Sequence, residues 1–111
     1  VKDAKILILG ITFKENCPDI RNTKVVDIYN TLIEYTNNIT VYDPWANFTH
    51  VQHEYGIDVT NVLPNEKYDT VILAVAHKEF IGLDVKSMLN DKGVVYDVKG
   101  VLPREIVDAR L

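Results

Sequence analysis

Ala4-Lys5-Ile6-Leu7-Ile8-Leu9-Gly10 opens the stretch that decides the fold, and the charged loop Ile11–Asn22 follows it directly. The continuous apolar run before Gly10 predicts a parallel strand that is covered on both faces. The loop is longer than the connection of about 2–6 residues that usually joins a strand to a helix. A helix is expected to open near Thr23, and its apolar positions repeat at helical spacing as far as Ile33. In a doubly wound α/β domain, the loop after such a first strand meets the ligand.

Strands and helices continue to alternate along the rest of the chain. We expect strands over 39–43, 57–59, 69–76 and 94–98, and helices over 46–55 and 84–90. Asn37-Asn38 is predicted to stop the first helix and Gly56 the second, whereas the tail Leu102–Leu111 is expected to pack on the outside. The alternation predicts a three-layer, Rossmann-like open sheet that is mostly parallel, with right-handed crossovers and helices on both faces.

Composition narrows the class of protein. The chain has 111 residues, which indicates one domain, and no apolar run approaches the roughly 20 residues of a membrane span. The net charge of −4 argues against a nucleic-acid-binding surface, so an anion would need a local cluster of cations. Cys17 is the single cysteine, which fits a reducing cytoplasm. Because the chain opens Val1-Lys2-Asp3 without an initiator Met, we expect it to be a piece of a longer protein.

Parallel strands bring the residues that follow them to one edge of the sheet, where ligands of such sheets bind. By this argument one edge collects Phe13, Lys14, Arg21, Asp43, His77 and Lys99. Two cations and an aromatic ring within one loop suit an anionic ligand that carries a ring. The dinucleotide fingerprint G-x-G-x-x-G is absent, since no two of the five glycines are close enough to form it. A nucleotide would therefore be held by side chains and helix-start amides.

Four segments resemble a known family. They are GITFKENCPDIRNT at 10–23, VYDP at 41–44, AVAH at 74–77 and YDVKG at 96–100. Together they resemble the UDP-binding, C-terminal domain of the UDP-glucose/GDP-mannose dehydrogenase family over essentially the whole chain. The sequence motif FKENCPDIRN resembles that of the branch that oxidises UDP-N-acetylhexosamines in capsule and O-antigen synthesis. The resemblance implies that residues 1–111 are one UDP-sugar-binding domain, excised from a longer multidomain dehydrogenase.

The resemblance also implies the activity of the parent. Such enzymes oxidise the C6 hydroxyl of a UDP-hexose or UDP-N-acetylhexosamine to a carboxylate, in two hydride transfers to NAD. NAD would be bound mainly by an N-terminal domain, and a central helical segment would carry the nucleophilic Cys. Both parts are missing here, so the chain alone is expected to be inactive and to hold no catalytic residue. The parent is expected to be a cytoplasmic homo-oligomer with neither a nucleic-acid nor a membrane partner.

The resemblance further implies roles for residues of the edge. Phe13, Lys14 and Lys99 would bind the UDP-sugar, and each has a structural alternative as a hinge aromatic or a solvated lysine. Arg21 would reach across the interdomain cleft to the NAD phosphates, because its planar fork suits bidentate contacts. The alternative for Arg21 is a pair with Asp19 that only shapes the loop.

For several other residues a structural role is expected, or is one of the alternatives. Asp43 is read as a loop anchor before Pro44, and His77 either bonds the nucleotide or ties down the following helix. Cys17 lies in the loop and is not expected to be the nucleophile. His50, His53 and Glu54 share a helix face, but two imidazoles without a third placed ligand predict no metal site. The competing function is a non-catalytic, flavodoxin-like module that binds a nucleotide or a partner.

Overall fold

The computed structural model describes residues 4–21, 23–99 and 109–110. Its elements follow the chain in the order β1 (Ile6–Leu9), α1 (Val25–Leu32), β2 (Ile39–Tyr42), α2 (Phe48–Tyr55), β3 (Val59–Thr60), β4 (Tyr68–Leu73), the 3₁₀ turns η1 (Lys78–Phe80) and η2 (Val85–Met88), β5 (Leu89–Asp97) and β6 (Ala109–Arg110). None of the helices within these ranges has the length and apolarity needed to cross a membrane.

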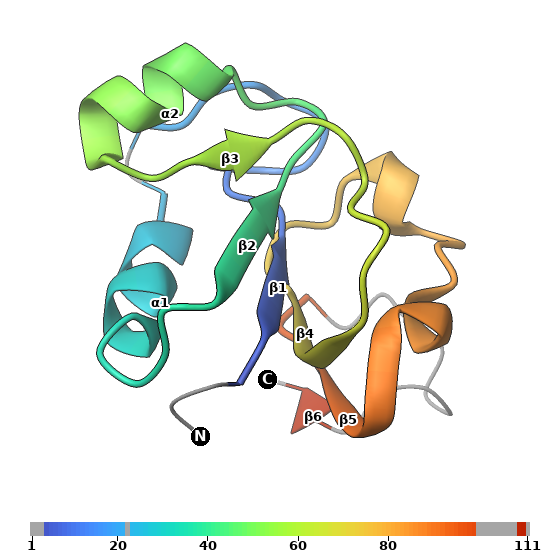
Figure 1. The fold of residues 1–111 in the computed structure, drawn as a ribbon. Coiled ribbons are helices and arrows are strands. Elements are labelled where there is room, and N and C mark those ends of the chain that lie inside the picture. The colour runs from blue at the N-terminus through green and yellow to red at the C-terminus, as the bar shows by residue number, and fades with distance from the viewer. Residues whose placement is uncertain (1–3, 22, 100–108, 111) are drawn as a thin grey trace.

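The described strands form one parallel sheet in the order β3-β2-β1-β4-β5-β6 (Figure 1). β1 is central, with Leu9 opposite Tyr42 of β2 and Leu73 of β4. From β1 the chain first moves outward through β2 and β3, and then crosses to β4 and moves outward in the other direction. The strand order therefore reverses between β1 and β4. In open α/β sheets, ligands bind outside the carboxyl ends of the strands at such a point.

The two faces of the sheet carry separate cores, because successive side chains of a strand point to opposite faces. Ile8 belongs to the core that also contains Val25 of α1 and Val51 of α2. Leu9 belongs to the opposite core, together with Phe80 of η1 and residues of η2. The predicted three-layer, parallel, Rossmann-like fold is confirmed. Its second covering layer is made of 3₁₀ turns among the described residues, where a helix over 84–90 was expected.

The first helix is shorter than predicted. It begins at Val25 and ends at Leu32. The expected stop at Asn37-Asn38 is wrong, because neither asparagine has a positive φ. The chain instead leaves the helix through a turn in which the Thr36 hydroxyl donates a hydrogen bond to the carbonyl of Ala4 at 2.7 Å. This contact ties the end of α1 to the start of β1, so a tertiary contact sets the boundary.

The predicted helix over 84–90 is also wrong. Val85–Met88 form a 3₁₀ turn, and the next two residues already belong to β5. Val85 and Met88 are both buried. Side chains three residues apart lie above one another in a 3₁₀ turn, so a single short turn buries the pair.

β5 is longer than the strand predicted over 94–98, because it begins at Leu89. The register against β4 shifts between Tyr68 and Thr70, and Lys92 has a φ of 64°. β5 thus continues through residues 90–93 with an irregular register against β4. Of the tail, 109–110 form β6 beside β5, whereas residues 102–108 and 111 lie outside the described residues.

Other predicted elements are confirmed within a few residues. The second helix runs over Phe48–Tyr55, and Asn47 caps its start by accepting a hydrogen bond from the amide N–H of His50 at 2.9 Å. Gly56 ends it in the left-handed conformation, with a φ of 69°. β2, β3 and β4 lie at or beside the predicted ranges.

Candidate functional site

Gly10 ends β1 and brings the following loop close to the carboxyl end of β4. Its φ is 97°, and a Cβ at this position would lie 2.6 Å from the Cβ of Val75. Glycine suits both the backbone conformation and the close approach. The loop thereby passes directly beside two side chains from other strand ends, so that Thr12 contacts both Asp43 and His77.

Asp43 follows β2 and is fully buried. Its Oδ2 accepts hydrogen bonds from the backbone N–H groups of Ile11 at 2.7 Å and Thr12 at 3.2 Å. Its Oδ1 accepts from the backbone N–H groups of Trp45 at 2.7 Å and Ala46 at 3.1 Å. One carboxylate therefore holds the loop after β1 with one oxygen and the loop after β2 with the other.

The electrostatics of Asp43 match this anchoring role. Burial by itself raises the pKa of Asp43, but the hydrogen bonds from His77 and from the backbone amides hold the pKa below its usual range. The carboxylate is consequently ionised at neutral pH and satisfied by protein donors. The prediction that Asp43 anchors the loop before Pro44 is confirmed.

His77 comes from the loop after β4, and its ring is fully buried. Nδ1 accepts a hydrogen bond from the backbone N–H of Asn16 at 2.8 Å, so the neutral ring carries its proton on Nε2. Nε2 lies 3.0 Å from Oδ2 of Asp43 and 3.0 Å from Oγ1 of Thr12. The Thr12 hydroxyl donates its own hydrogen to the carbonyl of Lys14 at 3.0 Å and can therefore accept from the ring.

Of the two roles expected for His77, the structure shows the structural one, but the segment that it holds differs from the prediction. Its ring ties down the loop after β1, whereas we expected it to tie down the helix that follows it. Trp45 stacks on the imidazole, with ring centroids 6.1 Å apart and planes at 25°. Asp43 and His77 therefore do not project from the edge of the sheet as predicted, because they lie beneath the loop.

Asn16 closes the far end of the same loop. Its backbone lies in the left-handed region with a φ of 55°, and its Oδ1 accepts a hydrogen bond from the backbone N–H of Lys78 at 2.8 Å. The loop is therefore held to the segment after β4 at two places, Thr12 and Asn16. The amide N–H of Phe13 also donates to the carbonyl of Asp19 at 2.6 Å, which folds the loop back on itself.

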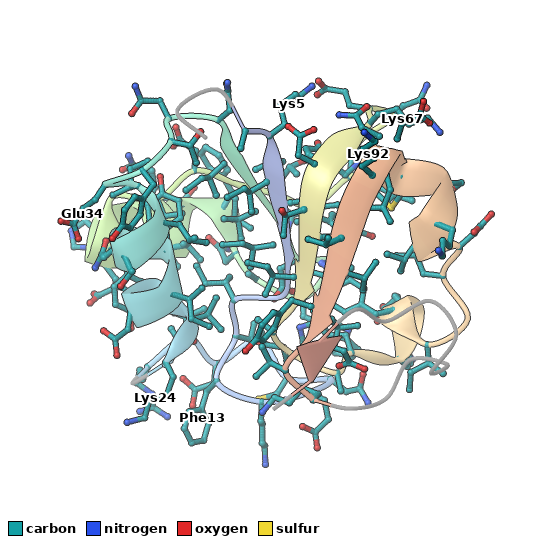
Figure 2. All side chains as sticks on the ribbon, turned by 90° about the horizontal axis from the view of Figure 1, so that it is seen from below. Lys5, Phe13, Lys24, Glu34, Lys67 and Lys92 are labelled. Atoms are coloured by element: carbon teal, nitrogen blue, oxygen red, sulfur yellow. The ribbon has the colours of Figure 1, made fainter. Side chains whose placement is uncertain are left out.

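Phe13 and Lys14 lie between these two anchors. The side chain of Phe13 is 55% exposed, and it lies at the end of the molecule opposite Lys5, Lys67 and Lys92 (Figure 2). Lys14 is exposed, and its ammonium group has no hydrogen-bond or ion-pair partner within the described residues. An aromatic face and an unpaired cation thus stand together at the carboxyl edge of the sheet. Their binding of a UDP-sugar stays a prediction.

Arg21 forms the ion pair that was its structural alternative. Its Nε and one terminal nitrogen donate to the two carboxylate oxygens of Asp19, each at 3.0 Å, and its backbone N–H donates at 2.9 Å. These bonds lower the pKa of Asp19 to about 2. The Arg21 side chain is nevertheless 83% exposed. The pair shapes the loop while leaving the guanidinium accessible, so contact with NAD phosphates stays a prediction.

Lys99 follows β5, two strands away from β1. Its side chain is exposed, and its backbone N–H donates to Oδ1 of the buried Asp97 at 3.0 Å. The turn after β5 is therefore held by a carboxylate, as the turn after β2 is. The structure brings Lys99 to the same edge as the loop after β1, and its contact with substrate stays a prediction.

Residues 7–104 match the UDP-binding domain of the UDP-glucose/GDP-mannose dehydrogenase family. The chain belongs to that family. It is similar to the UDP-N-acetyl-D-glucosamine 6-dehydrogenases of Salmonella typhi and Pseudomonas aeruginosa, with 43% and 44% identity over 114 residues. Each alignment covers 100% of this chain and 27% of the relative, so the chain spans about a quarter of the length of these curated relatives. In fold it is similar to the UDP-glucose dehydrogenase of Pyrobaculum islandicum, with a TM-score of 0.76 and 24% identity, covering 99% of this chain and 25% of that one.

These similarities confirm the predicted family and agree with the predicted UDP-N-acetylhexosamine branch. The dinucleotide site of an NAD-binding fold, however, does not fit this domain. Such a site needs a glycine-rich turn that receives the pyrophosphate and a free acid after the second strand for the ribose. Here Gly10 packs against Val75, and both oxygens of Asp43 are bonded to protein. The described residues therefore do not form a dinucleotide site of that kind.

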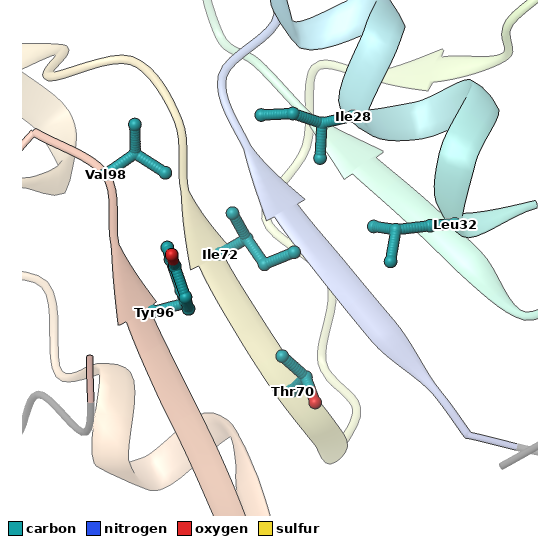
Figure 3. Close-up of a pocket in the computed structure, with 6 residues that line it drawn as sticks. All are labelled: Ile28, Leu32, Thr70, Ile72, Tyr96 and Val98. Atoms are coloured by element: carbon teal, nitrogen blue, oxygen red, sulfur yellow. The ribbon is translucent and has the colours of Figure 1, made fainter. Parts of the chain in front are cut away.

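Two other features lie outside the strand edge. A cavity of about 400 Å³ on the sheet face beside α1 (Figure 3) is lined by Ile28, Leu32, Thr70, Ile72, Tyr96 and Val98. Among the described residues that line it, none is charged and none is a predicted binding residue, so this lining does not suit a pyrophosphate. His50, His53 and Glu54 are exposed, and within the described ranges no cluster of His, Cys, Asp and Glu could hold a metal ion. Cys17 is a half-buried free thiol of the loop.

Sequence reasoning missed three residues of the network, Thr12, Asn16 and Trp45. Asn16 carried a readable signal, because asparagine adopts left-handed backbone more readily than most residues and the loop has no glycine after Gly10. Thr12 and Trp45 carried none, since their roles depend on contacts with distant strand ends.

Proposed function

We propose that this chain is the UDP-sugar-binding C-terminal domain of an NAD-dependent nucleotide-sugar 6-dehydrogenase. The whole enzyme would oxidise the C6 hydroxyl of a UDP-hexose or UDP-N-acetylhexosamine to a carboxylate in two hydride transfers. A UDP-N-acetylhexosamine is the favoured substrate, because the relatives similar over the whole chain carry that activity in their names. The domain binds the nucleotide sugar and supplies no catalytic group.

The observation that carries this proposal is the family match over residues 7–104, joined to the exposed Phe13–Lys14 pair at the point where the strand order reverses. The Lys14 ammonium has no protein partner within the described ranges, so a phosphate can take it without breaking an existing ion pair. Phe13 offers a ring beside it. Lys99 adds a second cation at the same edge and contacts the sugar or the phosphates.

The remaining assignments concern the parent. NAD is bound mainly by an N-terminal domain, and Arg21 extends from this domain towards its phosphates when the two domains close. Cys17 is not the nucleophile, which belongs to a central segment. The parent is a homo-oligomer, and its compartment is the cytoplasm, in keeping with a single cysteine in residues 1–111.

Titration of the 111-residue chain with UDP tests the proposal. A charge-assisted hydrogen bond to phosphate contributes about 1.5–3 kcal/mol, so Lys14→Ala should weaken UDP binding roughly ten- to a hundredfold. Lys86→Ala removes an exposed lysine of η2 and is the matched control, with UDP affinity expected to stay unchanged. Absence of UDP binding by the unmutated chain would contradict the proposed function.

Arg21→Ala separates the two ligands. In the isolated chain it should barely alter UDP affinity, whereas in the full-length enzyme it should raise the KM for NAD. Lys14→Ala should raise the KM for the UDP-sugar instead. Equal losses of UDP binding from both changes, with NAD kinetics untouched by Arg21→Ala, would contradict the assignment.

A further inference from the structure

The loop that carries Phe13 and Lys14 is bonded to a fully buried ring that lies beneath it. Thr12 precedes the pair and Asn16 follows it, and both residues contact the imidazole of His77, one at each ring nitrogen. The ring comes from a residue more than 60 positions later in the chain and is fully buried. His77 therefore clamps the loop at both ends of its exposed part.

We propose that His77 is a positioning residue for nucleotide binding: as a neutral ring with its proton on Nε2, it holds residues 12–16 so that Phe13 and Lys14 face the ligand. This inference rests on the proposed function, because it explains how the UDP-binding loop is prepared. It adds to that function a residue that makes no contact with the nucleotide.

The contacts of His77 with the loop depend on which ring nitrogen carries the proton. The Asn16 N–H needs an acceptor, and Nδ1 supplies it. The buried Asp43 needs donors, and the Nε2–H supplies one at 3.0 Å. Only the Nε2–H form of the ring meets both demands, since the other tautomer would set two N–H groups against each other at Asn16. The ionised Asp43 therefore selects the tautomer that holds the loop.

Clamping lowers the entropy that ligand binding must remove. A free loop would have to be ordered when the nucleotide binds, whereas a clamped loop is already ordered. Lys78 supports the same end of the loop, because its backbone N–H donates to Oδ1 of Asn16 at 2.8 Å. Loss of the Nδ1 contact alone should thus loosen the loop without removing any group that touches UDP.

Two substitutions separate the ring nitrogens. His77→Gln places an amide near the position of Nε2 and has no acceptor at the position of Nδ1. His77→Asn places an oxygen near the position of Nδ1 and keeps the acceptor for Asn16. We expect His77→Gln to weaken UDP binding roughly tenfold, and His77→Asn to recover a substantial part of that loss.

Val51→Ala is the control for a loss of stability alone. Val51 is a buried residue of α2, and its apolar side chain forms no hydrogen bond with Asp43, His77 or Asn16. It should lower the melting temperature while leaving UDP affinity unchanged at temperatures well below melting. Wild-type affinity in His77→Gln, or the same loss of affinity in Val51→Ala, would overturn the proposal.

Nuclear magnetic resonance on the unmutated chain gives a readout that needs no variant and no UDP. The ¹⁵N shifts of His77 should report the Nε2–H tautomer, and a coupling should be seen across the hydrogen bond between the Asn16 amide nitrogen and Nδ1. The Asn16 amide should exchange slowly with solvent. A rapidly exchanging Asn16 amide or the opposite tautomer would overturn the positioning role. Failure of the unmutated chain to bind UDP would instead overturn the proposed function, so the two failures are distinguishable.

Discussion

Replacing Asp43 with asparagine should cost more stability than any other single-atom change at the strand edge. Asparagine has nearly the same shape as aspartate, but it has one oxygen where aspartate has two. In the structure, each carboxylate oxygen of Asp43 accepts hydrogen bonds from two backbone N–H groups, and Oδ2 also meets the ring of His77. The Asp43→Asn change therefore cannot preserve the network in either orientation of the amide.

The magnitude follows from which bonds are lost. If the amide oxygen replaces Oδ2, the NH₂ group faces the N–H donors of Trp45 and Ala46. If it replaces Oδ1, the NH₂ group faces the N–H donors of Ile11 and Thr12. Either way two buried backbone donors lose their acceptor. Breaking a buried charged network by changing one partner costs about 3–5 kcal/mol, so we expect a loss of that size in Asp43→Asn.

Urea denaturation followed by far-UV circular dichroism measures the change. A natural domain is stable by about 5–15 kcal/mol, so Asp43→Asn should fold with a much lower urea midpoint. Asp58→Asn is the matched control, because Asp58 is exposed and the change removes the same charge. It should shift the midpoint by no more than the equivalent of about 0.5 kcal/mol. A loss below about 1 kcal/mol in Asp43→Asn would refute the network argument, because charge-assisted bonds contribute more than that each.

The pH dependence gives a second check on the same residue. The pKa of Asp43 in the folded chain lies below its ordinary value of 3.8. Its contribution to stability is therefore fully present above pH 3.8 and is lost as the pH falls through the folded-state pKa. Asp43→Asn cannot titrate, so its free energy of unfolding should fall less steeply in acid than that of the unmutated chain.

Three further outcomes are expected. Tyr68→Phe should leave stability unchanged or raise it by up to about 1 kcal/mol, because the buried hydroxyl of Tyr68 has no hydrogen-bond partner among the described residues; a lower melting temperature would contradict this. Gly10→Ala should destabilise the chain by about 2–4 kcal/mol in urea denaturation, since the added Cβ would lie 2.6 Å from Val75 in a backbone with φ 97°; an unchanged midpoint would show that the loop relaxes freely. Arg21→Ala should return the pKa of Asp19 from about 2 towards 3.8 in a carboxyl-carbon NMR titration. The contribution of the Arg21–Asp19 pair to the stability of the fold should be present above pH 3.8 and fade as the pH falls towards 2. An unchanged pKa of Asp19 in Arg21→Ala would mean that Arg21 does not hold this carboxylate.

Much of the fold was predictable from local sequence. The apolar runs of β1 and β4 have the length and continuity of strands buried on both faces, and Gly56 marks the end of α2 through its left-handed φ. Alternation of elements then implied a parallel sheet, and a parallel sheet brings the loops after its strands to one edge. These features depend on periodicity and on single-residue backbone preferences, so the amino-acid sequence determines them before any tertiary contact forms.

Predictions failed where a boundary depended on packing. The 3₁₀ turn at Val85–Met88 replaces a predicted helix, because one turn is enough to bury both end residues against the sheet. The first helix ends early because Thr36 bonds to the carbonyl of Ala4. Neither partner of these contacts is visible from the neighbouring sequence.

In the candidate site, too, some features follow from the local sequence and others from tertiary contacts. The sequence by itself determined that Phe13, Lys14 and Lys99 would follow strand ends, and that the loop after β1 would carry charge and an aromatic ring. Only the tertiary structure decided that Asp43 and His77 would be buried under that loop instead of facing a ligand. The reason is distance along the chain. The bonds that hold the loop join residues about 30 to 65 positions apart, so their partners are chosen only when the sheet assembles and brings three strand ends together.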